Sequence, residues 1–408
     1  MSTQSSEHEG VLMAGHPPRG SQTPDVAATV RSVVERTVSR EAPEVDRQGR
    51  FPRASVEALA EAGLLGLLAA PEVGGAGQGL RAAAHVVERL AASCGSTAMV
   101  TLMHYAATTL IEAHGPTEVR RAIAAGTHLT TLALSEAGSR SHFWAPLGTA
   151  RPDDRDGTGG VLLDADKSWV TSAGEADSYV WSSRPLDADG PMTLWLVPAD
   201  TDGLSVAGGF DGLGLRGNSS SPVTARQARL PRAAMLGDDG AGMDIALATA
   251  LPAFLVLNAA ASLGTMEAVL TAAREHLTGT RLAHLGRTLA DDPSRRGRYA
   301  ELRVRADGVR AFVTDTLTAL ETDREDATLR VLQVKAVAAE AAAEVTDGVM
   351  KLCGGSAFRR DLGVERHFRD SLAARVMAPT TEALHDFTGR ASLGLPLFDA
   401  PDGSDGRA

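Results

Sequence analysis

One histidine in the first third of the chain has the chemistry that proton transfer requires. His104 lies in the apolar stretch Leu102–Tyr105. An imidazole titrates near neutral pH, so His104 can act as a general base or as a hydrogen-bond donor. A histidine in an apolar stretch can equally be a core residue whose ring is satisfied by a backbone carbonyl. We assign His104 as the candidate catalytic residue and keep the core alternative open.

A second candidate group combines an imidazole with two aromatic rings. His142, Phe143 and Trp144 follow one another in the chain. Aromatic side chains in such a run can line a substrate cavity, or they can belong to the core of a β-domain. We assign His142 and Trp144 to a substrate pocket. His284 and His385 are expected to be surface or interface residues.

Metal and phosphate-loop chemistry find little support in the sequence. The two cysteines, Cys94 and Cys353, show no metal-type spacing with histidine and are too few for a disulfide framework. We expect both to be small core residues, and we expect no metal site. The glycine loop 74–79 is not followed by Lys-Ser/Thr, which argues against a phosphate loop.

Composition limits the class of protein. The 408 residues are 43% hydrophobic, which is enough for one or two substantial cores. A net charge of -11 argues against nucleic acid as the main partner. The longest apolar run, 246–263, contains Pro252 and Asn258 and is more typical of a buried helix than of a membrane span. The N-terminus has no signal-peptide pattern, so we expect a cytoplasmic protein.

The candidate residues must be positioned by three zones of different texture. Residues 25–127 show helical periodicity, 128–235 show short β-prone runs between turns, and 236–398 are helical again. Residues 1–24 and 399–408 are polar and are expected to be tails. The expected helices are 26–38, 54–67, 245–261, 264–277, 294–321, 327–352 and 381–392, and the expected strands are 129–134, 161–163, 169–171, 179–182 and 192–197. The sequence predicts an α+β fold.

Several motifs, in order, resemble those of the acyl-CoA dehydrogenase superfamily over most of residues 25–397. They are Leu64-Leu-Gly-Leu-Leu with Pro71-Glu-Val-Gly-Gly-Ala-Gly, Leu134-Ser-Glu-Ala-Gly-Ser-Arg-Ser141, Lys167-Ser-Trp-Val-Thr-Ser-Ala-Gly174, Leu213-Gly-Leu-Arg-Gly-Asn-Ser-Ser220, Arg281-Leu-Ala-His-Leu-Gly286 and Lys351-Leu-Cys-Gly-Gly-Ser-Ala-Phe358. Each motif alone is weak, but their order and spacing together are specific. The resemblance implies an N-terminal helical domain, a middle β-barrel or sandwich, and a C-terminal four-helix bundle.

The resemblance also implies a flavin, with FAD favoured over FMN. Trp169 would pack near the isoalloxazine, and Thr171 would hydrogen-bond its edge. The remaining cofactor residues implied by the motifs are Ser135, Ser141, Arg281, Gly354, Gly355 and Thr380. Arg281 would reach the pyrophosphate across a subunit interface. Lys351 stands where the family has a glutamine, which is a departure near the adenine side.

The family's catalytic base is missing from this sequence. The glutamate that removes the substrate α-proton corresponds to Ala378, and an alternative family position for it corresponds to Phe254. Glu382 lies one helical turn beyond Ala378, so its side chain should not reach the place where the family's glutamate acts. We assign Ala378 and Phe254 to the substrate pocket. The neighbouring family arginine that helps to hold CoA corresponds to about Leu255.

A monooxygenase branch of the same fold matches in part. Phe368-Arg-Asp-Ser-Leu-Ala-Ala-Arg-Val-Met-Ala378 resembles its Trp-Arg-Asp-x-His-Ala-Gly-Arg-Val-His-Ala pattern, but Leu372 and Met377 replace both histidines. His104 resembles the histidine that those enzymes place beside the flavin. Related N-oxygenases that act on amino sugars also lack the glutamate.

We therefore expect a flavin-dependent oxidoreductase that oxygenates a small molecule. One alternative is an acyl-CoA or acyl-carrier-protein dehydrogenase with a non-standard base. Another is a non-catalytic flavin-binding subunit. The expected partner is a flavin reductase or an electron-transfer protein. The expected oligomeric state is a homodimer or a homotetramer. We expect neither a nucleic-acid nor a membrane partner.

Overall fold

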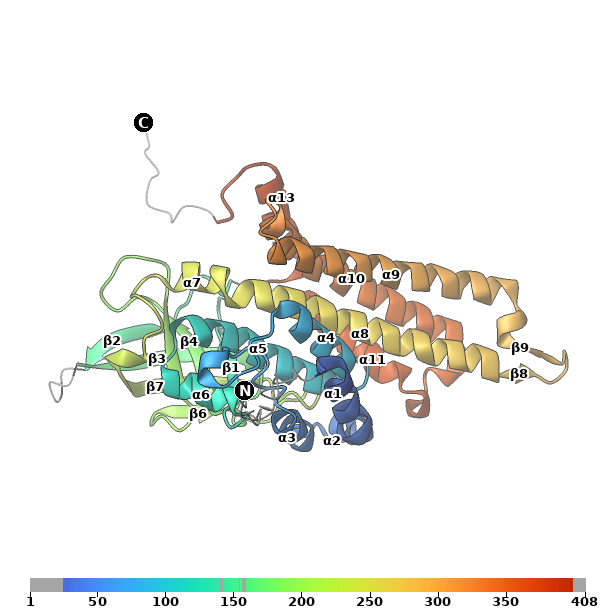
Figure 1. Ribbon diagram of the computed structural model, residues 1–408, viewed down its shortest axis with the longest axis horizontal. Coiled ribbons are helices and arrows are strands. Elements are labelled where there is room, and N and C mark those ends of the chain that lie inside the picture. Colours follow the sequence, from blue (N-terminus) through green and yellow to red (C-terminus); the bar gives the residue numbers. More distant parts are fainter. Residues whose placement is uncertain (1–24, 140–141, 154, 156–158, 399–408) are drawn as a thin grey trace, which may run out of the picture.

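Two helical regions enclose a small β-domain along the chain (Figure 1). The computed structural model describes residues 25–139, 142–153, 155 and 159–398. The expected tails and Ser141 lie outside the described residues. The fold is α+β, as the sequence predicts, and its three regions follow one another in the expected order.

The N-terminal region is helical because its apolar residues recur on one face of each short helix. Its elements are α1 (Val26–Val33), a π-helical turn η1 (Val34–Val38), α2 (Ser39–Gln48), α3 (Arg53–Glu61), α4 (Leu80–Ala91), α5 (Gly95–His114) and α6 (Thr117–Ala124). Asp25 caps α1 by accepting hydrogen bonds from the N–H groups of Ala27 and Ala28 at 3.0 and 3.2 Å. Helix α5 is buried on nearly all of its faces, so it forms the centre of this region.

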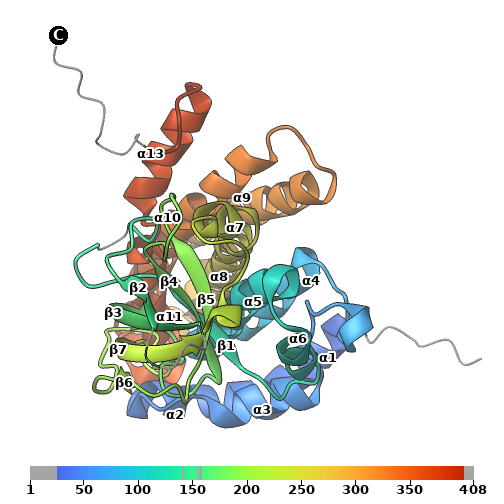
Figure 2. The ribbon, with the colours of Figure 1, turned by 90° about the vertical axis from the view of Figure 1, so that its left-hand side faces the viewer.

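The β-domain consists of two sheets around a shared core (Figure 2). Its strands are β1 (Thr130–Ala133), β2 (Thr149–Asp153), β3 (Gly160–Val170), β4 (Ser178–Ser183), β5 (Thr193–Pro198), β6 (Leu204–Val206) and β7 (Ser221–Pro231). One sheet has the order β1-β4-β5, and the other has the order β2-β3-β7-β6. Trp181 and Trp195 pair across β4 and β5 and are fully buried. The predicted strands 161–163 and 169–171 belong to the long strand β3 and its exit.

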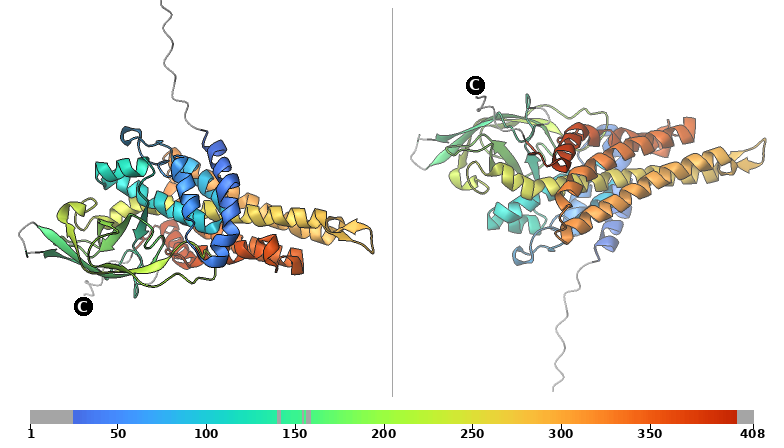
Figure 3. Two further views of the ribbon diagram at one scale, coloured as in Figure 1. Left: turned by 90° about the horizontal axis from the view of Figure 1, so that it is seen from below. Right: turned by 90° about the horizontal axis from the view of Figure 1, so that it is seen from above.

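The C-terminal region is built on long helices together with several short ones. They are α7 (Gly242–Ala248), α8 (Ala250–Gly279), α9 (Pro293–Glu321), α10 (Ala327–Cys353), α11 (Val364–Ser371), α12 (Ala373–Val376) and α13 (Thr381–Ser392). Helices α8 and α9 extend as an arm that ends in the hairpin of β8 (Arg281–Leu282) and β9 (Arg287–Thr288) (Figure 3). Helix α8 packs against α4, α5, α9 and α10.

The sequence predicts helices 245–261 and 264–277, whereas the structure interrupts the helix at Thr249, between α7 and α8, and continues α8 through residues 262 and 263. Gly264 lies inside α8. A glycine is needed there because α8 and α4 approach closely. A Cβ at position 264 would lie 2.1 Å from the carbonyl oxygen of Glu88. The stretch Gly242–Gly279 is long and apolar enough to cross a membrane, but 67% of its most apolar window is buried within the protein. That burial is typical of a core helix.

Candidate active site

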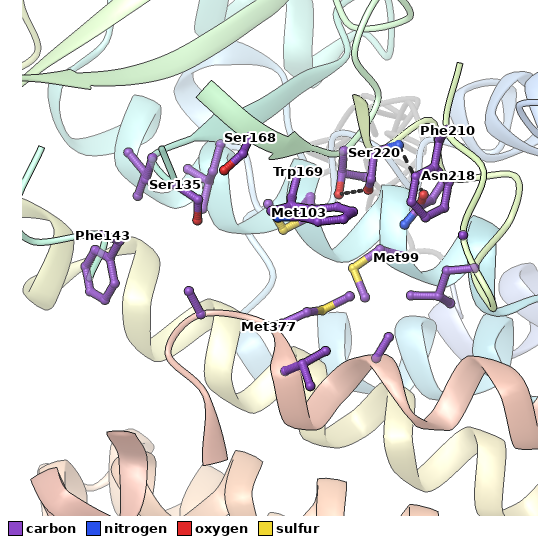
Figure 4. A pocket seen from close by; sticks show the side chains of 18 of the residues that line it. Met99, Met103, Ser135, Phe143, Ser168, Trp169, Phe210, Asn218, Ser220 and Met377 are labelled. Atoms are coloured by element: carbon purple, nitrogen blue, oxygen red, sulfur yellow. Dashed lines mark hydrogen bonds between the residues drawn. The ribbon is translucent and has the colours of Figure 1, made fainter. Parts of the chain in front are cut away.

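A large cavity lies between the β-domain and the C-terminal helices. Its volume is about 1450 Å³. Three methionines, Met99, Met103 and Met377, line it together with Trp169 and serines of the β-domain (Figure 4). Such a volume exceeds that of a typical single-ligand pocket, so it has room for a large cofactor together with a substrate.

The backbone of β3 turns the side chain of Trp169 toward this cavity. The register of β3 against β7 shifts between Lys167 and Val170, which is a β-bulge. Trp169 has a φ of 57°, a left-handed conformation that costs a non-glycine residue about 1–2 kcal/mol. Its side chain lines the cavity and is 70% exposed. A strained backbone that exposes a large aromatic ring is typical of a ligand-binding position.

Hydroxyl groups lie beside Trp169. Thr171 Oγ1 and Ser220 Oγ are 3.1 Å apart, and both residues line the cavity with Ser135. The loop that carries Ser135 is fixed to β3, because the Ser168 N–H donates to the Ser135 carbonyl at 2.9 Å. The hydroxyl oxygen of Ser139 in this loop is buried and has no hydrogen-bond partner among the described residues. These groups form a set of donors and acceptors that a polar ring edge can use.

A buried ion pair supports the same loop. Lys167 Nζ donates to Glu136 Oε1 at 2.6 Å, and both side chains are at most 2% exposed. Lys167 also donates to the carbonyl and the hydroxyl of Ser182, while Glu136 accepts from the N–H groups of Leu147 and Gly148. Burial lowers the pKa of Lys167 to about 8, and the adjacent Glu136 opposes that shift. Glu136 lines the cavity, but its negative charge is already neutralised.

An arginine and an aspartate fix the opposite rim of the cavity. Arg369 binds both carboxylate oxygens of Asp46 at 2.7 and 2.9 Å and donates to the Leu213 carbonyl at 3.1 Å. Asp370 accepts the Leu215 N–H at 2.6 Å, and burial raises the pKa of this carboxyl to about 6. The adjacent Arg369 and Asp370 thus hold the short stretch 213–215.

The residues at the two positions where a catalytic glutamate is expected both line the cavity. Ala378 and Phe254 lie on its wall, and Thr380 lies beside them as the N-cap of α13. Neither position carries an ionisable side chain. Among the described residues that line the cavity, the carboxylates are Glu136 and Asp211. Asp211 lies on an exposed glycine-rich loop and faces Arg216 at 3.7 Å.

The structure reveals one ionisable group near this wall that the sequence analysis missed. Lys335 on α10 is 1% exposed, and its Nζ donates to the carbonyls of Met377 and Pro379 at 2.8 and 2.7 Å. Burial lowers its pKa to about 7, and the more distant Glu382 opposes that shift. No sequence motif marks this lysine, because it lies in an alanine-rich helix far along the chain from its partners.

The assignment of His104 as a catalytic residue is not supported by its position. His104 is fully buried and does not belong to the cavity wall. Its Nε2 lies 3.0 Å from the Leu65 carbonyl, and its Nδ1 accepts the Thr130 N–H at 3.2 Å. A neutral imidazole protonated on Nε2 satisfies both bonds, and neither nitrogen is left for a substrate. The alternative of a core histidine satisfied by the backbone describes this residue.

Replacement of His104 with glutamine should therefore lower stability and leave the chemistry intact. Weakening the buried bonds to Leu65 and Thr130 should cost about 1–3 kcal/mol of unfolding free energy. Urea unfolding measures that loss, and the specific activity of the folded protein should stay within a few-fold of wild type. Loss of all activity in a folded variant would restore the catalytic assignment.

The pH dependence gives an independent control on His104. Burial lowers the pKa of His104 to about 4, well below the value near 6.5 of an unfolded histidine. Between these two values the unfolded state binds a proton and the folded state does not. The free energy of unfolding therefore falls as the pH drops from about 6.5 toward 4. His367, whose pKa burial lowers to about 3, adds to the same trend. The glutamine variant should show a shallower loss.

The assignment of His142 and Trp144 to a substrate pocket is also not supported. His142 is exposed, and neither residue lines the cavity, although Phe143 between them does. Trp144 packs against Phe387 and Phe398, with ring centroids 5.2 and 5.3 Å away. This aromatic cluster joins the loop to α13 and the segment after it. Trp144 supports the cavity wall from behind.

Three expected cofactor residues lie outside the cavity of their own chain. Arg281 is in the β8–β9 hairpin, at the tip of the arm and far from the β-domain (Figure 1). Its guanidinium donates to the Gly286 carbonyl at 3.0 Å. Gly354 ends α10 with a φ of 58°, and neither it nor Gly355 lines the cavity. Within one chain none of these three residues lines the cavity beside Trp169.

Comparison with known proteins identifies the family. Models of the N-terminal, middle and C-terminal domains of acyl-CoA dehydrogenase match residues 22–127, 131–228 and 240–393. The chain belongs to the acyl-CoA dehydrogenase family. It is a flavin-dependent oxidoreductase of that family. The matches run in the same order as the three regions of the fold.

Individual relatives are distant but cover nearly the whole chain. The mitochondrial short-chain specific acyl-CoA dehydrogenase of Bos taurus is 28% identical over 364 residues, which are 87% of this chain and 86% of that protein. The butyryl-CoA dehydrogenase of Megasphaera elsdenii has the same fold, with a TM-score of 0.84, 22% identity, and coverage of 91% and 98% of the two chains. A prolyl acyl carrier protein oxidase gives a TM-score of 0.83 at 18% identity, covering 92% and 99%. At these identities the structural matches establish the fold alone.

The residues of the cavity fit a flavin. Trp169 offers an exposed indole face for stacking, and the Thr171–Ser220 pair and Ser135 offer hydrogen bonds. When bound, a flavin supplies a hydride acceptor.

Proposed function

We propose that this protein oxidises an acyl thioester with FAD as its cofactor. The observation that carries the proposal is a cavity lined both by the apolar side chains of Met99, Met103 and Met377 and by hydroxyl groups near Trp169. An apolar wall suits an acyl chain, and the polar side suits the edge of a flavin ring. Methionine side chains adapt to irregular or branched groups, which favours a substrate other than a plain straight chain.

The missing carboxylate limits which thioesters can react. Removal of a carbon-bound α-proton by a positioned base contributes on the order of 10²–10⁴-fold in rate. Glu136 is neutralised by Lys167, and Asp211 is on an exposed loop. We therefore expect a slow reaction with simple saturated acyl-CoA. Substrates whose proton is unusually acidic, or sits on a heteroatom, should react faster.

Oxygenation of a small molecule is the second candidate. The missing carboxylate favours it, because Ala378 and Phe254 leave the cavity wall without a side chain that could accept an α-proton. The two candidates differ in the fate of dioxygen. Incorporation of labelled oxygen from dioxygen into a product supports oxygenation, and an unsaturated or oxidised thioester without the label supports the leading proposal.

The proposed partners follow from expected cofactor residues that do not line the cavity of their own chain. Arg281, Gly354 and Gly355 would reach a cofactor only from a second copy, so we propose a homodimer or a larger assembly with shared FAD sites. Leu255, in place of a family arginine, removes one contact to CoA, and this favours a carrier-protein thioester. Reduced flavin requires an acceptor, such as an electron-transfer flavoprotein or dioxygen.

Trp169 gives a direct test of cofactor binding. Of the four tryptophans, Trp181 and Trp195 are fully buried, while Trp169 is exposed on the cavity wall. Titration of flavin-free protein with FAD should quench the solvent-exposed part of the emission and protect it from iodide. Trp169→Phe should remove most of this response, and Trp144→Phe should retain it. Quenching that is equal in both variants would contradict the placement of the flavin beside Trp169.

A further inference from the structure

Lys335 lies behind the cavity wall at the place where the acidic residue is missing. Its Nζ donates to the carbonyl oxygens of Met377 at 2.8 Å and Pro379 at 2.7 Å. These two residues flank Ala378, and all three line the cavity. One ammonium group therefore holds the backbone on both sides of Ala378.

The same lysine contacts the second position that lacks a carboxylate. Lys335 Nζ lies 5.8 Å from the centroid of the Phe254 ring, and Phe254 lines the cavity. Asn258, one turn further along α8, contacts the Met377 sulfur through its side-chain nitrogen at 3.7 Å. Helices α8 and α10 thus meet the Met377–Pro379 segment through one cluster, with Lys335 between them.

Stability alone does not account for a lysine at this position. Taking an ammonium group out of water is costly unless an anion compensates it. Glu382 is exposed at the start of α13, and neither a hydrogen bond nor an ion pair joins it to Lys335 among the described residues. A methionine of similar length would pack there without this cost. The N–H groups of Lys335 therefore account for its presence, through the two carbonyls that they hold.

We propose that Lys335 is a positioning residue for the acyl-thioester substrate. It fixes the Met377–Pro379 backbone, so that the Met377 side chain and the small Ala378 side chain keep the shape of the acyl-binding wall. This inference rests on the proposed function. Without the ammonium group the two carbonyls turn toward other donors, and the wall loses its shape.

Lys335→Met tests the proposal, with Arg330→Met as a matched control. Arg330 is a cation on the same helix, paired with Asp326 at 2.8 Å and outside the cavity wall. We expect the KM for an acyl thioester to rise roughly 10- to 100-fold in Lys335→Met, the equivalent of one charged hydrogen bond, with a smaller change in kcat. The control should keep the wild-type KM. An unchanged KM in folded Lys335→Met protein would overturn the proposal.

Two further measurements guard against a variant that folds poorly. Lys335→Ala should recover a low KM when ethylammonium is added, because the small cation can occupy the space and restore both hydrogen bonds. In the substrate-free protein, amide hydrogen exchange around residues 377–383 should be faster in Lys335→Met than in wild type. Unchanged exchange would overturn the positioning role without reference to any substrate. Absence of thioester binding in wild-type protein would instead contradict the proposed function.

Discussion

Ala378→Glu is expected to give this protein a reaction that its wild-type form performs poorly, the exchange of α-protons in a simple acyl-CoA. Position 378 lies on the wall of a cavity of about 1450 Å³, so a longer side chain has room to extend. The nearby Lys335 ammonium should keep the new carboxylate ionised and able to accept a proton. A positioned base contributes on the order of 10²–10⁴-fold, and we expect a gain of that size.

The exchange is measured as deuterium incorporation from D₂O into butyryl-CoA, with FAD-loaded protein. Ala378→Gln is the matched control, since it has the same shape without the basic oxygen. Fast exchange in the glutamate variant alone is the expected result. Equal rates in wild type and both variants would mean that the thioester does not lie against this wall.

The second large effect concerns the buried pair of Lys167 and Glu136. Lys167→Met should lower the unfolding free energy by about 3–5 kcal/mol, because it leaves the Glu136 carboxylate buried without its cation. The loss should extend to cofactor binding, since the same pair fixes the loop that carries Ser135. Urea unfolding and FAD titration measure the two effects.

A double variant separates the charge from the packing. Glu136→Gln combined with Lys167→Met removes both charges and keeps an oxygen for the N–H groups of Leu147 and Gly148. It should recover most of the lost stability. A double variant as unstable as the single one would show that the ammonium contacts to Ser182, not the ion pair, dominate.

Much of the fold could be predicted because local patterns and motif order agreed. The helix Thr381–Ser392 coincides with its predicted range, and the long helices α9 and α10 differ from theirs by one residue at one end. Trp169 and Thr171 were predicted to share a site because the motif that carries them, 167–174, resembles a flavin-binding segment of the family. The structure adds the bulge and the positive φ at Trp169, which no composition signal announces.

The place of His104 away from the cavity has a physical reason that the sequence does not show. Helix α5 is apolar on nearly all faces, so periodicity gave no indication of which side of it faces the cavity. Met99 and Met103 line the cavity, while His104 is one residue further around the helix and turns into the core. Lys335 was missed for a different reason, the distance along the sequence to its partners. Its partners lie more than 40 residues away in the sequence, and only the packing of α10 against the Met377–Pro379 segment brings them together.

Oxidation of an acyl thioester by this protein is best measured by anaerobic mixing of FAD-loaded protein with acyl thioesters, on CoA and on a carrier protein. The absorbance of the oxidised flavin is followed over time. At least one thioester with an acidic or heteroatom-bound proton should bleach the flavin, and butyryl-CoA should do so slowly. A protein that binds FAD, is bleached by no thioester, and incorporates labelled dioxygen into a small molecule would contradict the oxidation of acyl thioesters.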